Sequence, residues 1–598
     1  MKPILTLIIF IILSSHHAYS NDIADSDAIR WLVTRATNHI DVQAPTIPNN
    51  LITTEVSSSQ INLSWSASSD NTAVTGYYIY QNGIFIKSTD RTSILITGLY
   101  TKTNYCFTVS AIDAENNESN QGSQLCATTP KATPFDNHHA FNGITNSTFA
   151  LSSCTNLPLE TAVGIFVSPA GTPTATGTQL DPLDLATALS STSIVTAGET
   201  IWLMEGIYKG NFTSKLRGTS LLPIKVKPLP GKRAIIDGNH ISGGAALTIS
   251  GDWADYYGLE VISSSATHTS AQTGSNPSDL VTNNGVTVTG PNTRVINFIV
   301  HDNVGGGISS WSNAPNSELY GNIIYNNGWT GPDRGHGHAI YAQNNTGFKK
   351  LTNNIIFFGY GTGIHVYTEG GQMNNFDVQH NTWFMTGASD PRASQKKDNC
   401  LIGGFKPVTN LLMKNNLGYS ENSRGIRLGY GGSVVGQDAI LMDNYLSENF
   451  WVAGSWSSLN VSNSAVFRGL TGVASSFISD GTNGNIVQIT PPATGNQVFV
   501  KANDHDPRRA RVVIYNHEDA PSVSVDLSSV LKSGEAYRIH SSFALFDAPM
   551  IEGVFDGNPV SIPMGSVVPP QPTGSNGIAD EDYPHRKFGV FIVTHGGC

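Results

Sequence analysis

The chain has 598 residues, a net charge of −11 and only 13% charged residues. At roughly 150 residues per domain, this length predicts about three or four domains, and 59 glycines favour turn-rich β-structure. The acidic balance argues against a chain whose whole surface serves nucleic acid or anionic lipid. Residues 331–430 differ, with ten Lys or Arg against six Asp or Glu. This local excess of +4 suits an anionic ligand or reflects ordinary scatter of surface charge.

The N-terminal residues resemble an export signal. Lys2 precedes an apolar run from Ile4 to Leu13, and the small residues Ala18 and Ser20 follow. This pattern predicts a secretory signal peptide over residues 1–20, followed by a polar lead-in over 21–47. Later apolar runs fall short of the ~18 residues of a membrane span. We therefore expect a secreted protein, extracellular or periplasmic, in which disulfides can form.

The cysteines argue against structural zinc, because none lie at metal-finger spacing. Their odd number leaves at least one thiol free. The five are Cys106, Cys126, Cys154, Cys400 and Cys598.

Residues 48–130 predict a small β-sandwich. Alternating strands are expected at 61–68 (INLSWSAS), 76–83 (GYYIYQNG) and 104–113 (NYCFTVSAID), with turn signals between them. With Trp65 in LSW, Gly98-Leu99 before TNY and FTVSAIDAENNES after it, this region resembles a fibronectin type III module. The resemblance implies that Tyr105 is the corner tyrosine and that Cys106 pairs with Cys126. Two separate buried thiols are the alternative.

Beyond a linker at 131–158 and a short helix at 183–189, residues 159–490 contain an irregular repeat. An Asn followed by a large or β-branched residue recurs at intervals of 25, 32, 27, 35 and 28 residues. One Asn per coil of a solenoid, each bonded to the next, explains the spacing. The expected rungs are Asn297, Asn322, Asn354, Asn381, Asn416 and Asn444.

A second series of aliphatic residues is expected to point into the core of these coils. Alternation along a strand then turns the following residue outward, and the residue two further on as well. The core series is Ile308, Ile340, Ile364, Leu401 and Ile426. The outward series is Ser309, Tyr341, His365, Ile402 and Arg427, followed by Trp311, Gln343, Tyr367, Gly404 and Gly429.

Residues 491–598 return to short alternating strands and predict an antiparallel β-sandwich. Arg508, Arg509 and Arg511 in it could contact a ligand or serve as solvated edge charges. The fold class is therefore all-β, with a parallel β-helix between two sandwiches.

The segments RGHGHAIYAQN and NNIIFFGYGTGIHVYTEGG, within residues 160–490, resemble right-handed parallel β-helices of the pectin-lyase-like type. This resemblance implies a secreted, polysaccharide-directed protein. The superfamily includes pectate and alginate lyases, polygalacturonases and uronate epimerases, as well as tailspikes and adhesins. The resemblance is specific for the fold and only weakly indicates the reaction.

The densest group of reactive side chains lies between Gly331 and Lys350. Asp333, Arg334, His336 and His338 form a predicted loop at the coil edge, and Tyr341 begins an outward ladder. β-Elimination or C5 epimerisation of a uronate needs a base, an acid and a cation for the carboxylate. Candidates for base and acid are Tyr341, His365 and His338, and those for the cation are Arg334 and Arg427. Aromatic and polar contacts to sugar are expected from Trp311, Gln343, Tyr367 and His336.

Two other chemistries stay open. Glycoside hydrolysis needs two carboxylates, for which Asp333, Glu369 and Asp398 are candidates. No cofactor is required, but a divalent cation could bind His336, His338 and Asp333, with His365 completing the set.

Each candidate also has a purely structural interpretation. His336 and His338 could cap a turn, Tyr341 could be a surface aromatic, and Arg427 could pack over Tyr430 or Tyr367. Lys349 and Lys350 are interpreted as solvated turn residues. The leading hypothesis is a monomeric, secreted enzyme that cleaves or epimerises an acidic polysaccharide, without a nucleic-acid partner. A glycoside hydrolase and a non-catalytic polysaccharide-binding or adhesive protein are the alternatives.

Overall fold

The structure is a computed structural model that describes residues 41–56, 61–96, 104–129, 162–190, 193–238, 244–265, 267–390, 397–421, 424–430, 435–472, 484–565, 567–573 and 586–595. The chain divides into two compact units, Met1–Ala140 and Phe141–Cys598. The predicted signal peptide, the linker at 131–158, Cys154 and Cys598 lie outside the described residues. No helix in the described parts has the length and apolarity to cross a membrane.

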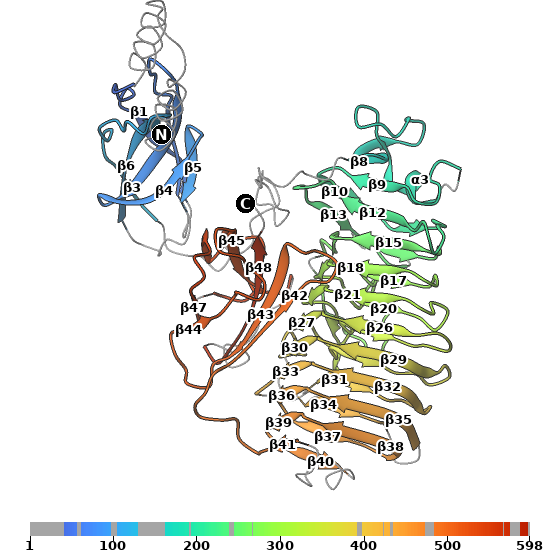
Figure 1. The fold of residues 1–598 in the computed structure, drawn as a ribbon. Helices are drawn as coiled ribbons and strands as arrows, with labels where there is room; N and C mark the ends of the chain where they lie inside the picture. The colour runs from blue at the N-terminus through green and yellow to red at the C-terminus, as the bar shows by residue number, and fades with distance from the viewer. Residues whose placement is uncertain are drawn as a thin grey trace, which may run out of the picture. The chain divides into compact units, whose positions relative to one another are not determined.

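The first unit is an antiparallel sandwich of two sheets (Figure 1). Trp65 packs edge-on against Tyr77 in its core, with ring centroids 5.4 Å apart, and Tyr105 is also buried there. Cys106 and Cys126 are directly opposite on neighbouring strands and form a disulfide, which confirms the expected pairing. One sheet consists of β1 (Asn49–Val56), β2 (Ile61–Ser66) and β5 (Ser93–Ile96), and the other of β4 (Ile84–Thr89), β3 (Val74–Gln81), β6 (Asn104–Asp113) and β7 (Leu125–Thr128).

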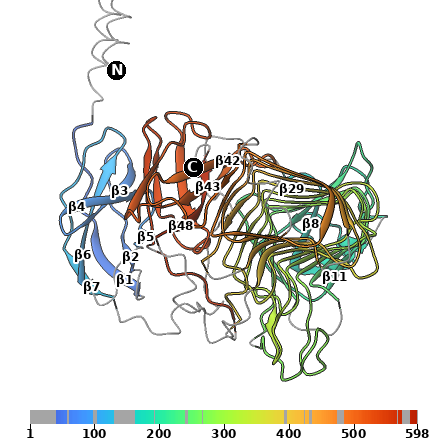
Figure 2. The same cartoon turned by 90° about the horizontal axis from the view of Figure 1, so that it is seen from below.

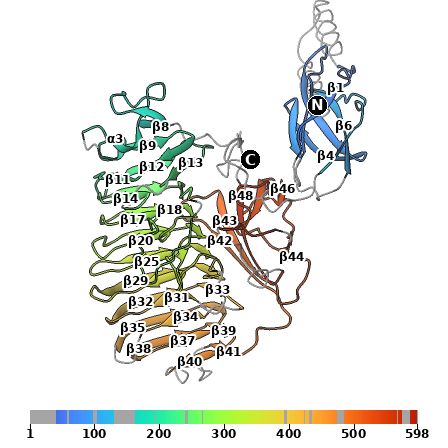
Figure 3. The ribbon, with the colours of Figure 1, turned by 180° about the vertical axis from the view of Figure 1, so that it is seen from behind.

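The second unit begins with a parallel β-helix whose coils stack in three long sheets (Figures 1 and 3). Helix α3 (Leu185–Ser190) packs Leu185, Ala188 and Leu189 into the core at the first coils. Sheet I consists of β8 (Ile165–Thr172), β9 (Thr200–Leu203), β12 (Ile224–Pro228), β15 (Ala254–Tyr257), β18 (Arg294–Ile296), β21 (Glu318–Tyr320), β26 (Lys349–Thr352), β29 (Met373–Gln379), β32 (Val408–Lys414), β35 (Val435–Met442) and β38 (Ser455–Ser462).

Sheets II and III complete each coil. Sheet II consists of β10 (Gly206–Lys209), β13 (Ala234–Asp237), β16 (Glu260–Ile262), β19 (Ile299–His301), β22 (Ile323–Tyr325), β27 (Ile355–Phe357), β30 (Thr382–Phe384), β33 (Leu417–Tyr419), β36 (Tyr445–Ser447), β39 (Ala465–Phe467) and β41 (Ile486–Val487). Sheet III consists of β11 (Phe212–Ser214), β14 (Leu247–Ile249), β17 (Val286–Val288), β20 (Ile308–Ser310), β25 (Ile340–Ala342), β28 (Ile364–Val366), β31 (Asp398–Ile402), β34 (Gly425–Leu428), β37 (Phe450–Val452) and β40 (Leu470–Gly472).

A buried asparagine ladder joins the coils at the turn from sheet I to sheet II. Each side-chain amide donates to the carbonyl of the next, at 2.9 Å from Asn322 to Asn354 and 2.9 Å from Asn354 to Asn381. The same bonds continue to Asn416 and Asn444, at 3.1 and 3.0 Å. These bonds satisfy amides that would be costly to bury unpaired, so they hold the register of the coils.

The expected rung at Asn297 is wrong. Phe298 occupies the ladder position in that coil, and its amide donates to Asn322 Oδ1. Asn297 belongs to the preceding, left-handed column, with a φ of 57°, where Asn353 and Asn415 also lie. Because Asn tolerates this conformation better than most residues, both columns are rich in Asn and the sequence does not separate them.

The core series is correct except in β31. Ile308, Ile340 and Ile364 are paired in successive coils, but the next partner of Ile364 is Cys400 rather than Leu401. The register shifts between Asp398 and Cys400, where Asn399 is an extra residue. This β-bulge turns Leu401 outward and Ile402 inward, and the expected outward positions of Ile402 and Gly404 are therefore wrong by one residue.

Lys349 is fully buried rather than a solvated turn residue. Its ammonium donates to Ser310 O, Ser310 Oγ and Trp311 O at 3.1, 2.8 and 2.7 Å, inside the coil. Burial lowers the pKa of Lys349 to about 7. Lys350, the next residue on the strand, is exposed as expected.

The chain ends in an antiparallel sandwich that lies against the outer face of sheet II (Figures 1 and 3). Arg509 and Arg511 are buried in it, so they are not solvated edge charges. Its five-stranded sheet consists of β42 (Gln497–Ala502), β43 (Arg509–Tyr515), β48 (Phe588–His595), β45 (Ala536–Ser541) and β46 (Ile551–Val554), and its second sheet of β44 (Ser522–Val525) and β47 (Val560–Pro563).

Aromatic rings stack on the sheet II face beneath this sandwich. His301 lies 4.7 Å from Tyr325, and Phe357 lies 5.0 Å from both Tyr325 and Phe384. Phe588 of β48 packs on Phe384, with ring centroids 5.1 Å apart. The face is therefore a continuous apolar interface.

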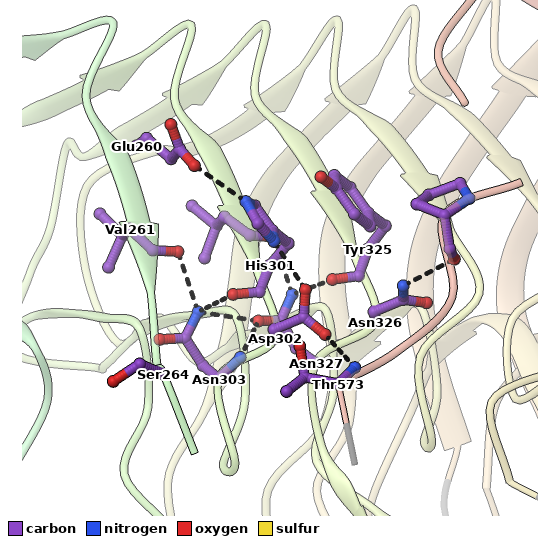
Figure 4. A network of polar contacts seen from close by, with 12 residues as sticks. Glu260, Val261, Ser264, His301, Asp302, Asn303, Tyr325, Asn326, Asn327 and Thr573 are labelled. Atoms are coloured by element: carbon purple, nitrogen blue, oxygen red, sulfur yellow. Dashed lines mark hydrogen bonds and ion pairs between the residues drawn. The ribbon is translucent and has the colours of Figure 1, made fainter. Parts of the chain in front are cut away.

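A network of charged residues lies at the edge of this interface (Figure 4). His301 lies between Glu260, at 3.1 Å, and Asp302, at 2.7 Å. Asp302 Oδ1 accepts a hydrogen bond from the amide of Thr573, which lies between β47 and β48 of the C-terminal sandwich. Burial disfavours the imidazolium, but these two carboxylates raise the pKa of His301 to about 9. His301 is therefore charged at neutral pH.

Candidate functional site

The outer face of sheet III carries the expected ladder. In the middle coils, Tyr341 is paired with His365 on adjacent strands, while their neighbours Ile340 and Ala342 point into the core. Strands of a sheet lie about 4.8 Å apart, so side chains in one column are close neighbours along the stack. The outward column runs through Thr213, Thr248, Thr287, Ser309, Tyr341, His365, Leu401, Arg427, Trp451 and Thr471.

Two histidines form the centre of this face. His338 Nε2 lies 3.1 Å from His365 Nδ1, close enough for one imidazole to donate to the other. Burial lowers the pKa of His338 to about 3, with a further contribution from Lys397 and Arg334. Burial also keeps the pKa of His365 well below its ordinary value, assisted by Arg427. Both rings are therefore neutral at pH 7, and each has one unprotonated ring nitrogen.

Tyr341 and its neighbours surround this pair. The ring of Tyr341 lies 5.3 Å from His365 and 5.3 Å from Trp311. Gln343 Nε2 donates to Tyr341 Oη at 3.3 Å and to Tyr367 O at 3.2 Å. Burial raises the pKa of Tyr341, so its phenol keeps the proton at neutral pH. The ring of Tyr367 stacks on His365 at 4.9 Å.

Arg427 lies two coils beyond His365 in the outward column. Its guanidinium is 3.0 Å from Asp398 and 4.8 Å above the Trp451 ring, with Tyr430 at 5.3 Å. Arg427 therefore packs near Tyr430, as its structural interpretation expects, and also over Trp451. Its positive charge also acts on His365, which places it within electrostatic reach of the pair.

The loop residues form a hairpin beside the face. β23 (Trp329–Thr330) and β24 (Gly335–His336) are antiparallel, and His336 stacks on Trp329 at 3.9 Å. Asp333 Oδ1 lies 3.1 Å from His336 Nε2, and Gly274 N donates to Asp333 Oδ2 at 3.3 Å. Burial opposes ionisation of Asp333, but these bonds lower its pKa to about 2.

The histidines of the His-x-His pair therefore have different partners: His336 pairs with Asp333, and His338 with His365. In the described parts of the chain, three potential metal ligands from His, Cys, Asp and Glu come together only at Asp41, Asp70 and Asp113, in the first unit. Asp333, His336, His338 and His365 therefore do not come together as such a three-ligand group.

The candidate carboxylates are differently placed. Asp398 is buried and paired with Arg427, and burial raises its pKa. Glu369 is exposed in the turn after β28 and acts electrostatically on Tyr341 and Tyr367. Asp333 is held by His336.

Sequence reasoning missed several residues of this face. Phe405 and Trp451 are 55% and 38% exposed, and Phe405 lies 6.2 Å from the Tyr367 ring. Trp451 could have been found by extending the outward column one coil past Arg427. Phe405 could not have been found in this way, because the bulge in β31 shifts the alternation of inward and outward residues in its coil by one position.

The fibronectin type III domain family matches residues 44–124, and the right-handed β-helix region family matches residues 229–390. The chain thus combines a fibronectin type III domain with a right-handed β-helix. A chitinase, Chi52 of Paenibacillus xylanexedens, is 40% identical over 89 residues, which are 15% of this chain and 17% of that protein. Exoglucanase B of Cellulomonas fimi is 43% identical over 96 residues, 16% of this chain and 9% of that protein. The chain therefore spans less than a fifth of the length of either relative.

Among solved structures, pectate lyase Pel9A is similar, with a TM-score of 0.36 and 16% identity over 56% of this chain and 89% of that one. An alginate lyase from Paenibacillus sp. str. FPU-7 gives a TM-score of 0.34 and 15% identity, over 50% and 97%.

Proposed function

We propose that this protein is a secreted enzyme that removes the proton beside the carboxylate of a uronate residue in an acidic polysaccharide. The outcome is β-elimination or C5 epimerisation. The observation that carries the proposal is the neutral His338–His365 pair, which lies beside a protonated Tyr341 on the outer face of sheet III.

The roles follow from the protonation states. His365 is the base that takes the C5 proton, and His338 accepts or shares it through the 3.1 Å contact. A bound carboxylate would itself raise the pKa of His365 and strengthen this base. Tyr341 is the acid, donating to the departing glycosidic oxygen in elimination or to the opposite face of C5 in epimerisation.

Charge on the intermediate is stabilised from the same face. The electrons left by the C5 proton move onto the carboxylate, which becomes an enolate and needs a nearby cation. Arg427 is the candidate, with Arg334 at the rim as a second. Trp311 and Tyr367, beside Tyr341 and His365, offer ring faces on which sugars can stack.

Secretion is part of the proposal. The disulfide between Cys106 and Cys126 is typical of proteins in oxidising compartments. The sandwich that contains this disulfide is a fibronectin type III domain. Domains of this family accompany catalytic modules in secreted carbohydrate-active enzymes, and we extend this to the present chain by analogy.

The test is to incubate the purified chain with uronate polymers. We expect ultraviolet absorbance from unsaturated chain ends, or exchange of the C5 proton for deuterium in heavy water. His365→Gln should lower either rate by about 100-fold or more without changing the melting temperature. Lys350→Gln, exposed on sheet I, is the matched control and should keep full activity.

Two results would contradict the proposal. New reducing ends without unsaturation or exchange would indicate glycoside hydrolysis. Tight binding of polymer without either chemistry would indicate a non-catalytic binding protein.

A further inference from the structure

A cleft opens on the sheet III face on the N-terminal side of the His338–His365 pair. It has a volume of 460 Å³. Thr248 and Thr287 of the outward column form its floor, and residues from the 263–285 segment, including Val281 and Asn284, form its wall. The proposed reaction uses none of these residues.

The floor of the cleft continues directly to the reactive groups. Thr287 is paired with Ser309, and Ser309 with Tyr341, so three strand spacings, roughly 14 Å, separate Thr248 from Tyr341. Asn284 Nδ2 donates to Ser309 Oγ at 3.3 Å at the boundary. A chain lying over Tyr341 can therefore extend along the coils into the cleft.

The segment that forms the cleft wall is hydrogen-bonded to the hairpin beside the site. Arg334 Nη2 donates to Ser275 Oγ at 3.0 Å, and Ser270 N donates to Thr330 O at 2.9 Å. Both segments connect sheet II to sheet III and extend from the coils as green loops in Figure 2. They therefore form one continuous wall along the outward column.

The cleft and the reactive end differ in charge. All ten described residues that line the cleft are uncharged: Gly244, Ala245, Thr248, Pro277, Leu280, Val281, Thr282, Asn283, Asn284 and Thr287. Around the histidine pair, by contrast, Arg334, Lys397 and Arg427 all act on the imidazoles. A carboxylate in the cleft would meet no cation among these lining residues, whereas one at the histidine pair would lie near three. Hydroxyls, amides and small apolar groups instead match a neutral sugar ring, with its hydroxyl edge and C–H face.

We propose that the cleft binds uncharged sugar residues, so that the substrate is a heteropolysaccharide in which neutral residues flank the reacting uronate, rather than a homopolymer of uronates. This inference rests on the proposed function and specifies its substrate class. One uronate lies at the His338–His365 pair, and the neighbouring neutral units lie over Ser309, Thr287 and Thr248.

The first experiment compares polymers on the full chain. Polygalacturonate, polymannuronate and polyguluronate represent homopolymers, and deacylated gellan and rhamnogalacturonan represent heteropolymers. We expect turnover of a heteropolymer and weak or no turnover of the homopolymers. Equal kcat/KM on a homopolymer would overturn the cleft assignment while leaving the proposed reaction intact.

The second experiment changes the floor. Thr287→Val removes a hydroxyl while keeping a β-branched side chain that suits a strand, and should raise KM for the heteropolymer about tenfold at constant kcat. Thr213→Val is the matched control, because Thr213 is exposed in the same column but outside the cleft lining. An unchanged KM in Thr287→Val would also overturn the assignment.

The two proposals fail separately. His365→Gln should lose turnover yet keep heteropolymer affinity, measured by calorimetry. If wild-type protein turns over no polymer but binds a heteropolymer, and Thr287→Val weakens that binding, the cleft assignment stands and the proposed reaction falls. Absence of both turnover and binding would overturn both.

Discussion

The outer faces of sheets II and III are built from the same coils but are covered differently. On sheet II, His301, Tyr325, Phe357 and Phe384 stack at about one-strand spacing and are buried under the C-terminal sandwich. On sheet III, Tyr341 and His365 of the outward column are only partly buried, although their column neighbours Ser309 and Leu401 are buried. Both faces have aromatic residues and histidines, so composition does not distinguish them. What distinguishes them is the covering sandwich, which converts one face into core.

Burial also gives the histidines of the two faces opposite electrostatics. His301 has two carboxylate partners that raise its pKa to about 9. Among the described residues no carboxylate acts on His338, and burial and nearby cations lower its pKa to about 3. The first is a charged structural group at pH 7, and the second is a neutral group available for proton transfer.

The largest expected contrast comes from removing one ring on each face. Phe357→Ala should destabilise the second unit by about 3–5 kcal/mol, because the cavity lies within a fully packed interface. Tyr341→Phe should change stability by less than about 0.5 kcal/mol but lower turnover about 100-fold or more, since it removes the proposed acid. Denaturant melts measure the stability of each variant, and turnover of the preferred polymer measures its activity. A destabilised Tyr341→Phe would contradict the distinction between the faces.

The pH dependence of stability should separate the histidines. Because the pKa of His301 is raised on folding, its contribution is complete below pH 6.5 and is lost as the pH rises to about 9. This loss amounts to up to about 3 kcal/mol and should be absent in His301→Gln. Because the pKa of His338 is lowered, its contribution is present above pH 6.5 and is lost as the pH falls towards 3. His338→Gln should flatten only that acid side of a melting-temperature profile.

The smallest expected effect comes from the influence of the Arg427 charge on the pKa of His365. Removing its charge with Arg427→Gln should raise the pKa of His365 and move the acid limb of kcat/KM to higher pH. Arg427→Lys keeps the charge and should keep the limb in place while raising KM, because bidentate contact to a carboxylate is lost. Identical pH profiles in the two variants would exclude Arg427 from the site.

Much of the architecture could be predicted because it repeats. The Asn ladder and the aliphatic core column recur once per coil, so several copies support each assignment, and the pairing of Tyr341 with His365 follows from the register that they set. The errors occurred where a single coil departs from the repeat. Asn399 inserts a bulge, and Asn297 lies in a left-handed column whose composition matches that of the ladder.

Other features depend on segments far apart in the sequence. Lys349 is buried because the carbonyls of Ser310 and Trp311, nearly forty residues earlier, accept its protons. The wall of the cleft comes from residues 277–284, in a segment that is hydrogen-bonded through Ser275 to the hairpin that carries Arg334. Neither relationship has a local periodicity that could reveal it.

The sequence by itself determined the coil repeat, the alternation of inward and outward side chains and the disulfide between adjacent strands, because each follows from short-range periodicity or a resemblance over one domain. Tertiary structure alone decided which outer face remains accessible and which residues share it. A side chain that points out of a coil is either core or surface according to what packs on it, and on sheet II that is a sandwich about two hundred residues further along the chain.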